Sequence, residues 1–205
     1  MGLSAEQLRE HLDALAAREP RFSDALALAG YPQPRVRARG YETLLRTIVG
    51  QQISFKAADS VWAKLATTVG KIENPAALIA LPDEALRGAG LSRQKVGYAR
   101  SLAELCVAGT INFNTLPKDD EEAITLLAQV KGIGRWSAEI YLLFAEGRPD
   151  IWPAGDLAVQ ESVRRIMGHD KRPSEKATRE IADAWRPYRG AAAIFAWHHY
   201  VVENI

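Results

Sequence analysis

The sequence has 205 residues, of which 47% are hydrophobic, enough for one domain with a sizeable core or for two lobes that share one. Lysine and arginine total 26 and aspartate and glutamate total 25, so the net charge indicates no partner. A single cysteine excludes an internal disulfide and a four-cysteine iron–sulfur cluster. No apolar run reaches membrane-spanning length and no signal peptide is recognised, so we expect a protein that is cytoplasmic, or nuclear in a eukaryote, and not secreted.

The charges are unevenly distributed along the chain. Residues 35–100 contain 11 basic and 5 acidic side chains, residues 101–163 contain 4 and 10, and residues 164–205 contain 8 and 5. The two basic stretches could form one nucleic-acid-binding surface, or they could be ordinary solvated helix faces. The counts favour neither interpretation.

The N-terminal part predicts two helices and a connector. Ser4 and Gln7 have the spacing of a capping box, which predicts a helix that runs to about Arg18. A second helix is expected over residues 21–28, and the glycine and prolines of residues 30–34 end it. The connector that follows contains Arg35, Arg37 and Arg39.

Residues 41–49 place their apolar side chains on one helical face, and Ser54 is positioned to cap a helix over residues 55–69. Gln51 and Gln52 lie between these two helices. Two glutamines at a helix end could simply be solvated, or they could have a binding role.

Two short helices with proline at their start are expected over residues 75–80 and 82–87, and a longer one ends at Val107. Cys106 shares the helical spacing of the apolar residues in that helix, so we predict that it lies in the core. Arg93 and Lys95 stand near the start of the same helix. They could contact phosphate, or they could belong to a capped surface helix.

Residues 117–146 predict two helices joined by a tight turn. Pro117, Asp119 and Asp120 cap the first helix, and Leu126, Leu127 and Val130 form its apolar stripe. Trp136, Ile140, Leu143 and Phe144 restart the helical period. Gly132 and Gly134 flank Ile133 in a turn that we predict to be too tight for β-carbons. The free N–H groups of Gly134 and Arg135 would then face an anion at the start of the second helix.

The loop at residues 146–156 ends in Asp156, which begins a helix that extends to Met167. An aspartate in this position is usually only an N-cap. Catalysis is the alternative that the neighbouring segments favour.

The C-terminal part predicts two more helices, one from Ser174 and one over residues 188–202. Trp62 and Trp185 are expected in the core. His198 and His199 point about 100° apart on a helix and no other histidine or cysteine cluster supports them, which argues against a catalytic metal. No segment alternates like a strand, so the fold class is all-α.

Four segments resemble one family. They are Ile-Val-Gly-Gln-Gln-Ile-Ser at 48–54, Gly-Leu-Ser at 90–92 with Lys95 and Tyr98, Gly-Ile-Gly-Arg-Trp-Ser-Ala at 132–138 and Trp-Pro-Ala-Gly-Asp-Leu at 152–157. Together they resemble the helix-hairpin-helix (HhH-GPD) DNA glycosylases, and within them the 3-methyladenine DNA glycosylase II branch. The resemblance implies one two-lobed domain over residues 1–205, with the hairpin at about 124–145 and the catalytic loop at 146–156. Without the N-terminal extension of longer members, the chain would be a minimal version.

The resemblance implies a monofunctional glycosylase that excises alkylated bases from double-stranded DNA. Asp156 would stabilise the sugar cation and orient water, and Gln52 would fill the gap left by the extruded base. The residues implied in DNA binding are Gln51, Gln52, Arg93, Lys95, Gly132, Gly134 and Arg135. We expect a monomer. A non-catalytic DNA-binding module and a glycosylase for oxidised or deaminated bases are the alternatives.

The family also implies a base pocket and an ion site. The pocket would be lined by Trp136, Ile140, Trp152, Tyr188 and Trp197, and Ile140 stands where some relatives have an aromatic residue. Trp136 occupies the position of the lysine that cuts the strand in bifunctional relatives, and core packing is its alternative role. No cofactor is required. A sodium or potassium ion could bind the backbone carbonyls of Ala128, Val130 and Ile133.

Overall fold

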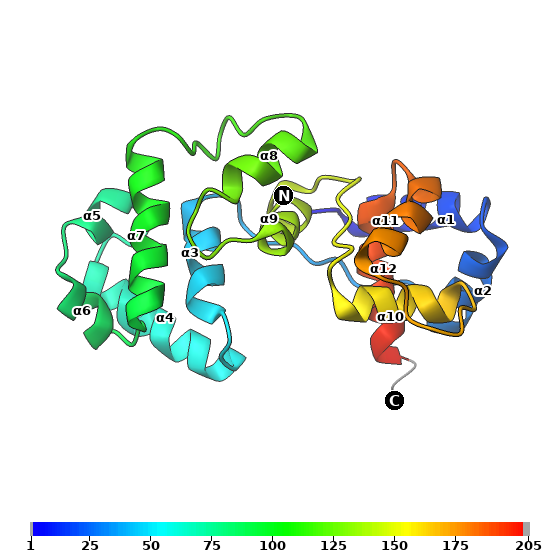
Figure 1. The fold of residues 1–205 in the computed structure, drawn as a ribbon, viewed down its shortest axis with the longest axis horizontal. Helices are drawn as coiled ribbons and strands as arrows, with labels where there is room; N and C mark the ends of the chain where they lie inside the picture. The colour runs from blue at the N-terminus through cyan, green and yellow to red at the C-terminus, as the bar shows by residue number, and fades with distance from the viewer. Residues whose placement is uncertain (1, 203–205) are drawn as a thin grey trace. The chain divides into compact units, whose positions relative to one another are not determined.

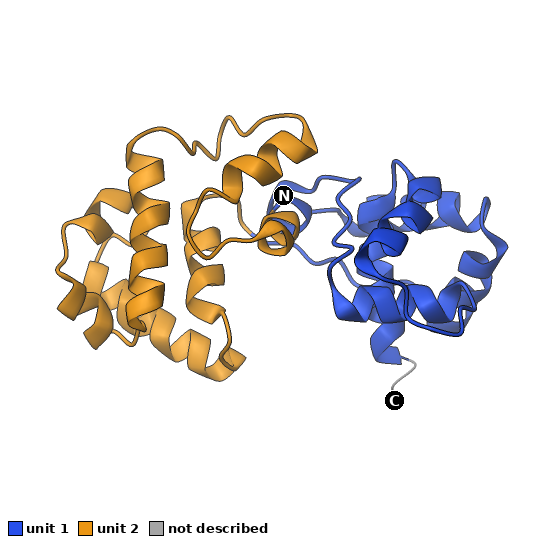
Figure 2. Cartoon of the chain, viewed as in Figure 1, with its two compact units in different colours: residues 1–37, 142–205 blue, residues 38–141 orange. Residues whose placement is uncertain are grey.

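The computed structural model describes residues 2–202, which fold into helices with no strand among them (Figure 1). The all-α prediction is therefore confirmed. The chain divides into two compact units (Figure 2): residues 1–37 and 142–205 form unit 1, and residues 38–141 form unit 2. Among residues 2–202, no helix has the length and hydropathy needed to cross a bilayer.

Unit 1 combines both ends of the chain. Its elements are α1 (Ala5–Ala16), α2 (Pro20–Ala29), the π-helical turn η1 (Leu142–Glu146), α10 (Leu157–Ile166), α11 (Glu175–Ala182), the 3₁₀ turn η2 (Asp183–Trp185) and α12 (Arg189–Val202). Helix α12 packs against α1, α2 and α10. The predicted capping box is confirmed, because Ser4 and Gln7 exchange side-chain and backbone hydrogen bonds at the start of α1.

Unit 2 is a continuous segment. Its helices are α3 (Tyr41–Gly50), α4 (Phe55–Val69), α5 (Pro75–Ile79), α6 (Asp83–Gly88), α7 (Arg93–Val107), α8 (Asp120–Leu127) and α9 (Arg135–Tyr141). Helix α7 packs against α3, α5 and α6, and α3 also contacts α4 and α9. Ser54 caps α4 and Asp119 caps α8, as predicted. Because both caps act within four residues, the sequence alone was sufficient to find them.

The cores confirm two predicted tryptophans and correct the cysteine. Trp62 in unit 2 and Trp185 in unit 1 are buried, with 9% and 3% of their surface exposed. Cys106 is only half-buried, so its placement in the core was wrong. It lies in the last turn of α7, where the next residue, Val107, is exposed. Burial still raises the pKa of the Cys106 thiol to about 11.

The second helix of the hairpin is shorter than expected. It ends as an α-helix at Tyr141 and continues as the π-helical turn η1, which belongs to unit 1. Within unit 1 the Phe144 carbonyl accepts a hydrogen bond from the Arg37 N–H at 2.8 Å. The π-helical turn η1 therefore holds the connector that contains Arg35, Arg37 and Arg39, since one of its carbonyls accepts this hydrogen bond.

Candidate active site

Asp156 lies at the end of the loop of residues 147–156 and begins α10. Its Oδ1 atom accepts hydrogen bonds from the Ala158 N–H at 2.9 Å and the Val159 N–H at 3.0 Å. The N-cap is therefore confirmed. These bonds also hold the half-buried carboxylate in one orientation, which a catalytic role would require. Capping and catalysis are thus compatible.

The loop before Asp156 is fastened to unit 1 by buried side chains. The Trp152 indole N–H donates to the Thr178 carbonyl at 3.1 Å. The buried Gln160 amide donates to the Ala154 carbonyl at 2.8 Å. Both bonds join the loop to the helices that follow it, so the position of Asp156 is set by the packing of unit 1.

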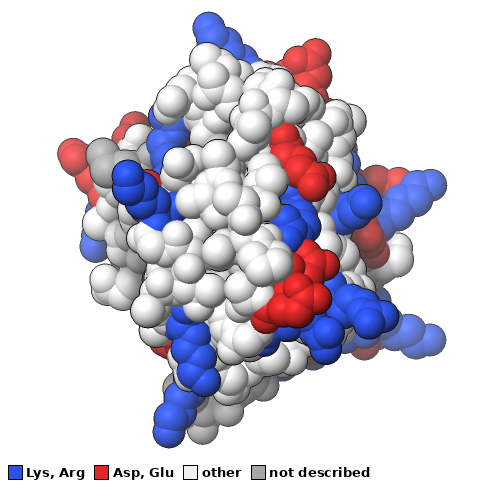
Figure 3. All heavy atoms as spheres, turned by 90° about the vertical axis from the view of Figure 1, so that its left-hand side faces the viewer, with Lys and Arg blue, Asp and Glu red and all other residues white. Residues whose placement is uncertain are grey.

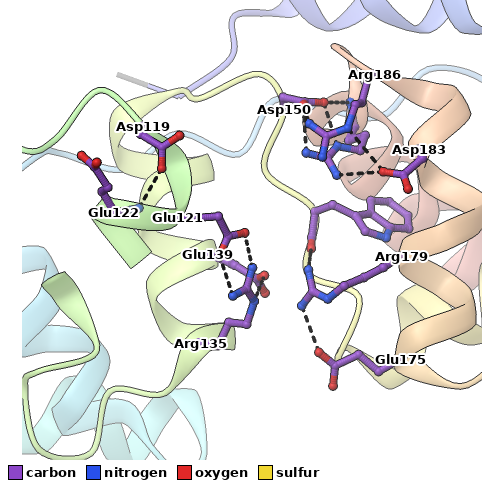
Figure 4. Close-up of polar contacts among 12 residues, drawn as sticks. Asp119, Glu121, Glu122, Arg135, Glu139, Asp150, Glu175, Arg179, Asp183 and Arg186 are labelled. Atoms are coloured by element: carbon purple, nitrogen blue, oxygen red, sulfur yellow. Dashed lines mark hydrogen bonds and ion pairs between the residues drawn. The ribbon is translucent and has the colours of Figure 1, made fainter. Parts of the chain in front are cut away.

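A cluster of charges fastens the first half of the same loop. Both carboxylate oxygens of Asp150 accept hydrogen bonds from Arg189, each at 2.8 Å, and Arg186 adds a third at 2.8 Å (Figure 4). The Gly190 N–H donates to the Pro149 carbonyl at 2.7 Å. A bidentate arginine is among the strongest of these contacts. Sequence reasoning missed this cluster, because about 39 residues separate its members.

Trp197, which is buried at 8% exposure, contacts a tilted aromatic ring and a cation. Its ring centroid lies 5.6 Å from that of Phe144, and the guanidinium carbon of Arg35 lies 5.4 Å from the Trp197 centroid. A cation over an aromatic ring, as Arg35 is here, is attracted by about 0.5–2 kcal/mol. The predicted pocket residue Trp197 thus has an aromatic neighbour and a face that attracts cations.

Two other predicted pocket residues lie elsewhere in unit 1. Trp152 is 2% exposed and meets Trp185 edge-on at 5.3 Å, so it is packed in the core of unit 1. Its role in the base pocket stays a prediction. Tyr188 packs on His11 at 4.7 Å. It precedes Trp197 by nine residues, about 13 Å along a helix, and the structure does not bring these two side chains together.

Gly132 is the one hairpin glycine that the turn requires. Its φ is +82°, and a β-carbon added there would lie 2.2 Å from the ring of Tyr98. At Gly134 an added β-carbon would meet no described atom within 4 Å, and φ is not positive. The prediction is therefore confirmed for Gly132 and wrong for Gly134, since only Gly132 rests on a neighbouring helix.

The turn itself contains residues expected in the first helix. Helix α8 ends at Leu127, and Val130 lies beyond it, buried at 1% exposure. Ile133 is also buried, at 3%, and its N–H donates to the Val130 carbonyl at 3.0 Å. The apolar pattern identified Leu127 and Val130 as buried correctly, but Leu126 is only half-buried. It also placed the end of the helix too late, because turn residues can point into a core as well.

The glutamine segment is attached to the hairpin. The Gln51 side-chain amide donates to the Gly132 carbonyl at 2.8 Å, and the Lys131 N–H donates to the Ser101 hydroxyl at 3.1 Å. Gln52 is exposed and has φ of +56°, a conformation uncommon for a residue other than glycine. Strained backbone of this kind is concentrated at functional sites. Gln51 therefore positions the turn that presents Gln52.

Arg135 bonds two carboxylates of unit 2. Its Nε lies 3.0 Å from Glu139, and Glu121 forms a bidentate pair with it (Figure 4). The Glu121 hydrogen bonds raise the pKa of the guanidinium. Glu139 is 2% exposed, and sequence reasoning missed it. Its i,i+4 spacing from Arg135 was the available signal. Arg135 was expected on phosphate, and in the DNA-free protein its charge is already compensated.

The first turn of α9 presents both an aromatic side chain and backbone donors. Trp136 is 46% exposed, which excludes the alternative of core packing, whereas Ile140 is 6% exposed. Among the described residues, no hydrogen bond uses the backbone N–H of Gly134 or Arg135. These two donors point to a surface that an anion can reach.

Arg93 and Lys95 differ in their surroundings. Lys95 Nζ donates to the Val49 carbonyl at 2.7 Å, and burial lowers the pKa of its amine. The amine therefore stabilises the end of α3. Arg93 is exposed and lines a pocket of about 580 Å³ that also contains Arg87. Glu84, Gly88, Gly90, Leu91 and Ser92 complete the lining.

The basic stretches contain many internal ion pairs. Arg46 lies 2.7 Å from Asp59, and Arg100 lies 2.7 Å from Asp83. On the face shown in Figure 3, lysine and arginine side chains are interspersed with carboxylates and form no continuous patch. On that face the charges resemble those of ordinary solvated helices.

The adjacent histidines bond to separate groups. His199 Nδ1 and the Ser162 hydroxyl are 3.1 Å apart, and His198 Nε2 lies 2.8 Å from the Ala29 carbonyl oxygen. Within residues 2–202, no group of three histidine, cysteine, aspartate or glutamate residues is placed to hold a metal ion.

Known proteins match both the sequence and the fold. The family model for HhH-GPD superfamily base excision DNA repair proteins matches residues 45–187. DNA-3-methyladenine glycosylase 1 of Schizosaccharomyces pombe is 32% identical over 161 residues, which cover 77% of this chain and 71% of the relative.

Two solved structures share the architecture. A DNA-3-methyladenine glycosidase from Bacillus halodurans has a TM-score of 0.88 and 30% identity, over 95% of this chain and 90% of that one. The 3-methyladenine DNA glycosylase of Schizosaccharomyces pombe, in complex with abasic DNA, has a TM-score of 0.77 and 27% identity, over 96% and 97%. The chain therefore belongs to the HhH-GPD superfamily of base excision DNA repair proteins, in the branch of the 3-methyladenine DNA glycosylases.

Proposed function

We propose that this protein is a DNA glycosylase that removes alkylated bases, of the 3-methyladenine and 7-methylguanine type, from double-stranded DNA. The reaction is hydrolysis of the N-glycosidic bond. The family match and the names of its relatives support this substrate class. The single observation that supports catalysis is the carboxylate of Asp156, held by two backbone N–H groups on a loop that buried contacts fasten.

Asp156 acts on the sugar rather than on the base. An alkylated purine with a positive charge is already a good leaving group, so no general acid is needed. As the glycosidic bond breaks, the sugar develops an oxocarbenium-like charge, which the carboxylate stabilises while it orients the attacking water. A preorganised charge of this kind typically contributes about 10²–10³ in rate. An aromatic face such as that of Trp197 favours the cationic base.

The hairpin and the glutamine turn hold the DNA. The N–H groups of Gly134 and Arg135 bind a backbone phosphate, and Gln52 enters the duplex where the base has left. An amide there can donate to and accept from the orphaned partner base. The hydrogen bond from the Gln51 side chain to the Gly132 carbonyl supports this proposal, because it joins the turn that contains Gln52 to the hairpin that would bind phosphate.

The enzyme releases the base without cutting the strand, and it acts as a monomer. Strand cleavage by bifunctional relatives requires an amine that attacks the sugar, and the indole of Trp136 has none. Borohydride trapping on DNA with an alkylated base should therefore yield no covalent protein–DNA adduct. A trapped adduct would contradict the monofunctional assignment.

We also propose a monovalent cation at the hairpin turn. Carbonyl oxygens have two lone pairs, and among the described residues those of Ala128 and Ile133 accept no hydrogen bond, whereas that of Val130 accepts one. These three carbonyls would hold sodium or potassium and fix the turn. A higher melting temperature in potassium than in a bulky organic cation of equal ionic strength would support this site.

Release of free 3-methyladenine from methylated DNA is the test of the whole proposal. The wild type should release the base, and Asp156→Asn should release it far more slowly. DNA binding without release of any base would favour a non-catalytic binding module. Release of oxidised or deaminated bases in preference to alkylated ones would favour the other enzyme class.

A further inference from the structure

The turn between α3 and α4 exposes two apolar side chains. Phe55, the first residue of α4, is 91% exposed, which is more than any other large apolar side chain among residues 2–202. Ile53, two residues earlier, is 40% exposed. Removing such surface from water is favourable, so covering it would contribute favourably to the free energy of binding a partner.

This apolar pair lies on a rigid part of unit 2. The Ser54 hydroxyl between the two residues accepts a hydrogen bond from the Ala57 N–H at 3.3 Å, which caps α4. On the other side, Gln51 is bonded to the hairpin carbonyl of Gly132 at 2.8 Å. Gln52, three residues before Phe55, carries the positive φ of +56°. Phe55 therefore begins a capped helix three residues after Gln52, the side chain assigned to the duplex gap.

The segment also has the charge that DNA requires. Residues 51–56 contain no aspartate or glutamate, and they end in the exposed Lys56. A phosphate backbone could therefore approach the exposed apolar pair without meeting a carboxylate of this segment.

We propose that Phe55, assisted by Ile53, is an apolar wedge that packs against the bases next to the gap. This inference rests on the proposed function, in which Gln52 fills that gap. When a base leaves the stack, its neighbours lose a stacking partner, and proteins that distort DNA insert apolar side chains at such steps. Gln52 satisfies the hydrogen bonds of the orphaned base, while Phe55 covers the apolar faces. The wedge is tolerant of sequence, because every base has such a face.

Equilibrium binding of Phe55→Ala tests the wedge on two duplexes, one with a tetrahydrofuran abasic analogue and one undamaged. The variant should bind the abasic duplex about tenfold more weakly, the usual scale of one lost base–aromatic contact. Binding to the undamaged duplex should change by less than about twofold, since its stack is closed. Phe55→Trp should retain the affinity, and Phe55→Leu should lie between.

Val107→Ala is the matched control, because Val107 is 58% exposed and lies at the far end of α7 in the same unit. It should bind both duplexes like the wild type, and all variants should melt with the wild type. Unchanged affinity of Phe55→Ala for the abasic duplex would overturn the proposal. So would an equal loss on both duplexes, or a changed sedimentation coefficient, which would assign Phe55 to a protein contact.

The two proposals can fail separately. Binding to the abasic analogue needs no base excision, so the wedge is measurable even if the wild type releases no base. If instead the wild type releases 3-methyladenine and Phe55→Ala binds and excises equally well, only the wedge is wrong.

Discussion

The hairpin turn and the loop before Asp156 are both short irregular segments that lead into a helix, yet they are held in opposite ways. The loop uses its polar groups inside unit 1, where Trp152 and Gln160 form buried hydrogen bonds. In the hairpin, Gly132 lies against the Tyr98 ring and its carbonyl accepts a bond from Gln51. The N–H groups of Gly134 and Arg135 form no hydrogen bond with described residues.

This difference is what the two proposed roles, catalysis by Asp156 and phosphate binding by the hairpin, would require. A catalytic carboxylate gains from being immobile before the substrate arrives, because reorientation during the reaction would cost free energy. A phosphate-binding turn must instead keep its backbone donors for the ligand. The same contrast predicts that substitutions in the loop change the rate, whereas substitutions in the hairpin change stability and binding.

Asp156→Asn should have the largest effect on rate. Asparagine can keep the N-cap at nearly the same volume, so the melting temperature should change little. Loss of the charge beside the sugar cation should slow single-turnover excision of 3-methyladenine by about 10²–10³, or roughly 3–4 kcal/mol. Affinity for DNA should persist or increase. Excision at the wild-type rate would remove Asp156 from the mechanism.

Gly132→Ala should destabilise unit 2 by about 2–4 kcal/mol, since alanine must adopt a positive φ and displace the Tyr98 ring. Gly134→Ala is its matched control, because an added β-carbon there meets no described atom. Chemical denaturation should separate the two variants clearly. Equal stability of both would mean that the turn can shift away from Tyr98.

Gln52→Ala should slow excision by about tenfold. Extrusion of a base costs a few kcal/mol, and the variant lacks the side-chain amide that would compensate by contacting the orphaned partner base. Stability should stay close to that of the wild type, because the side chain is exposed. Gln52→Gly is the sharper variant. Glycine adopts a positive φ without strain, so this variant should melt at or above the wild-type temperature. It should still excise slowly, because it lacks the amide side chain. Full activity of both variants would leave Gln52 as a helix end only.

Arg93→Ala should produce the smallest change, a few-fold loss of affinity with a salt slope reduced by about 0.9, the value of one phosphate contact. Arg135→Ala provides the comparison. It removes a partner of the buried Glu139, so it should lower the melting temperature more than Arg93→Ala does. Titration of DNA binding from low to moderate salt would show both slopes. An unchanged slope for Arg93→Ala would place that residue away from the phosphates.

The sequence was sufficient for the elements and for several of their ends. The caps at Ser4, Ser54, Asp119 and Asp156 all form as predicted, because a cap depends on residues within four positions. The all-α class followed from helical periodicity for the same reason. Where periodicity failed, as at Val130, the buried side chain was correct and the helix end was not.

What the sequence by itself determined is therefore local: helices, caps, the glycine turn and the family that its motifs resemble. Only the tertiary structure decided which arginine and lysine side chains pair with carboxylates and that Trp152 lies in the core. It also decided that the Gln51 side chain bonds the hairpin 81 residues further along the chain. A charged or aromatic side chain acts according to the groups packed around it, and helices distant in the sequence supply those groups. No local pattern specifies which helices these are.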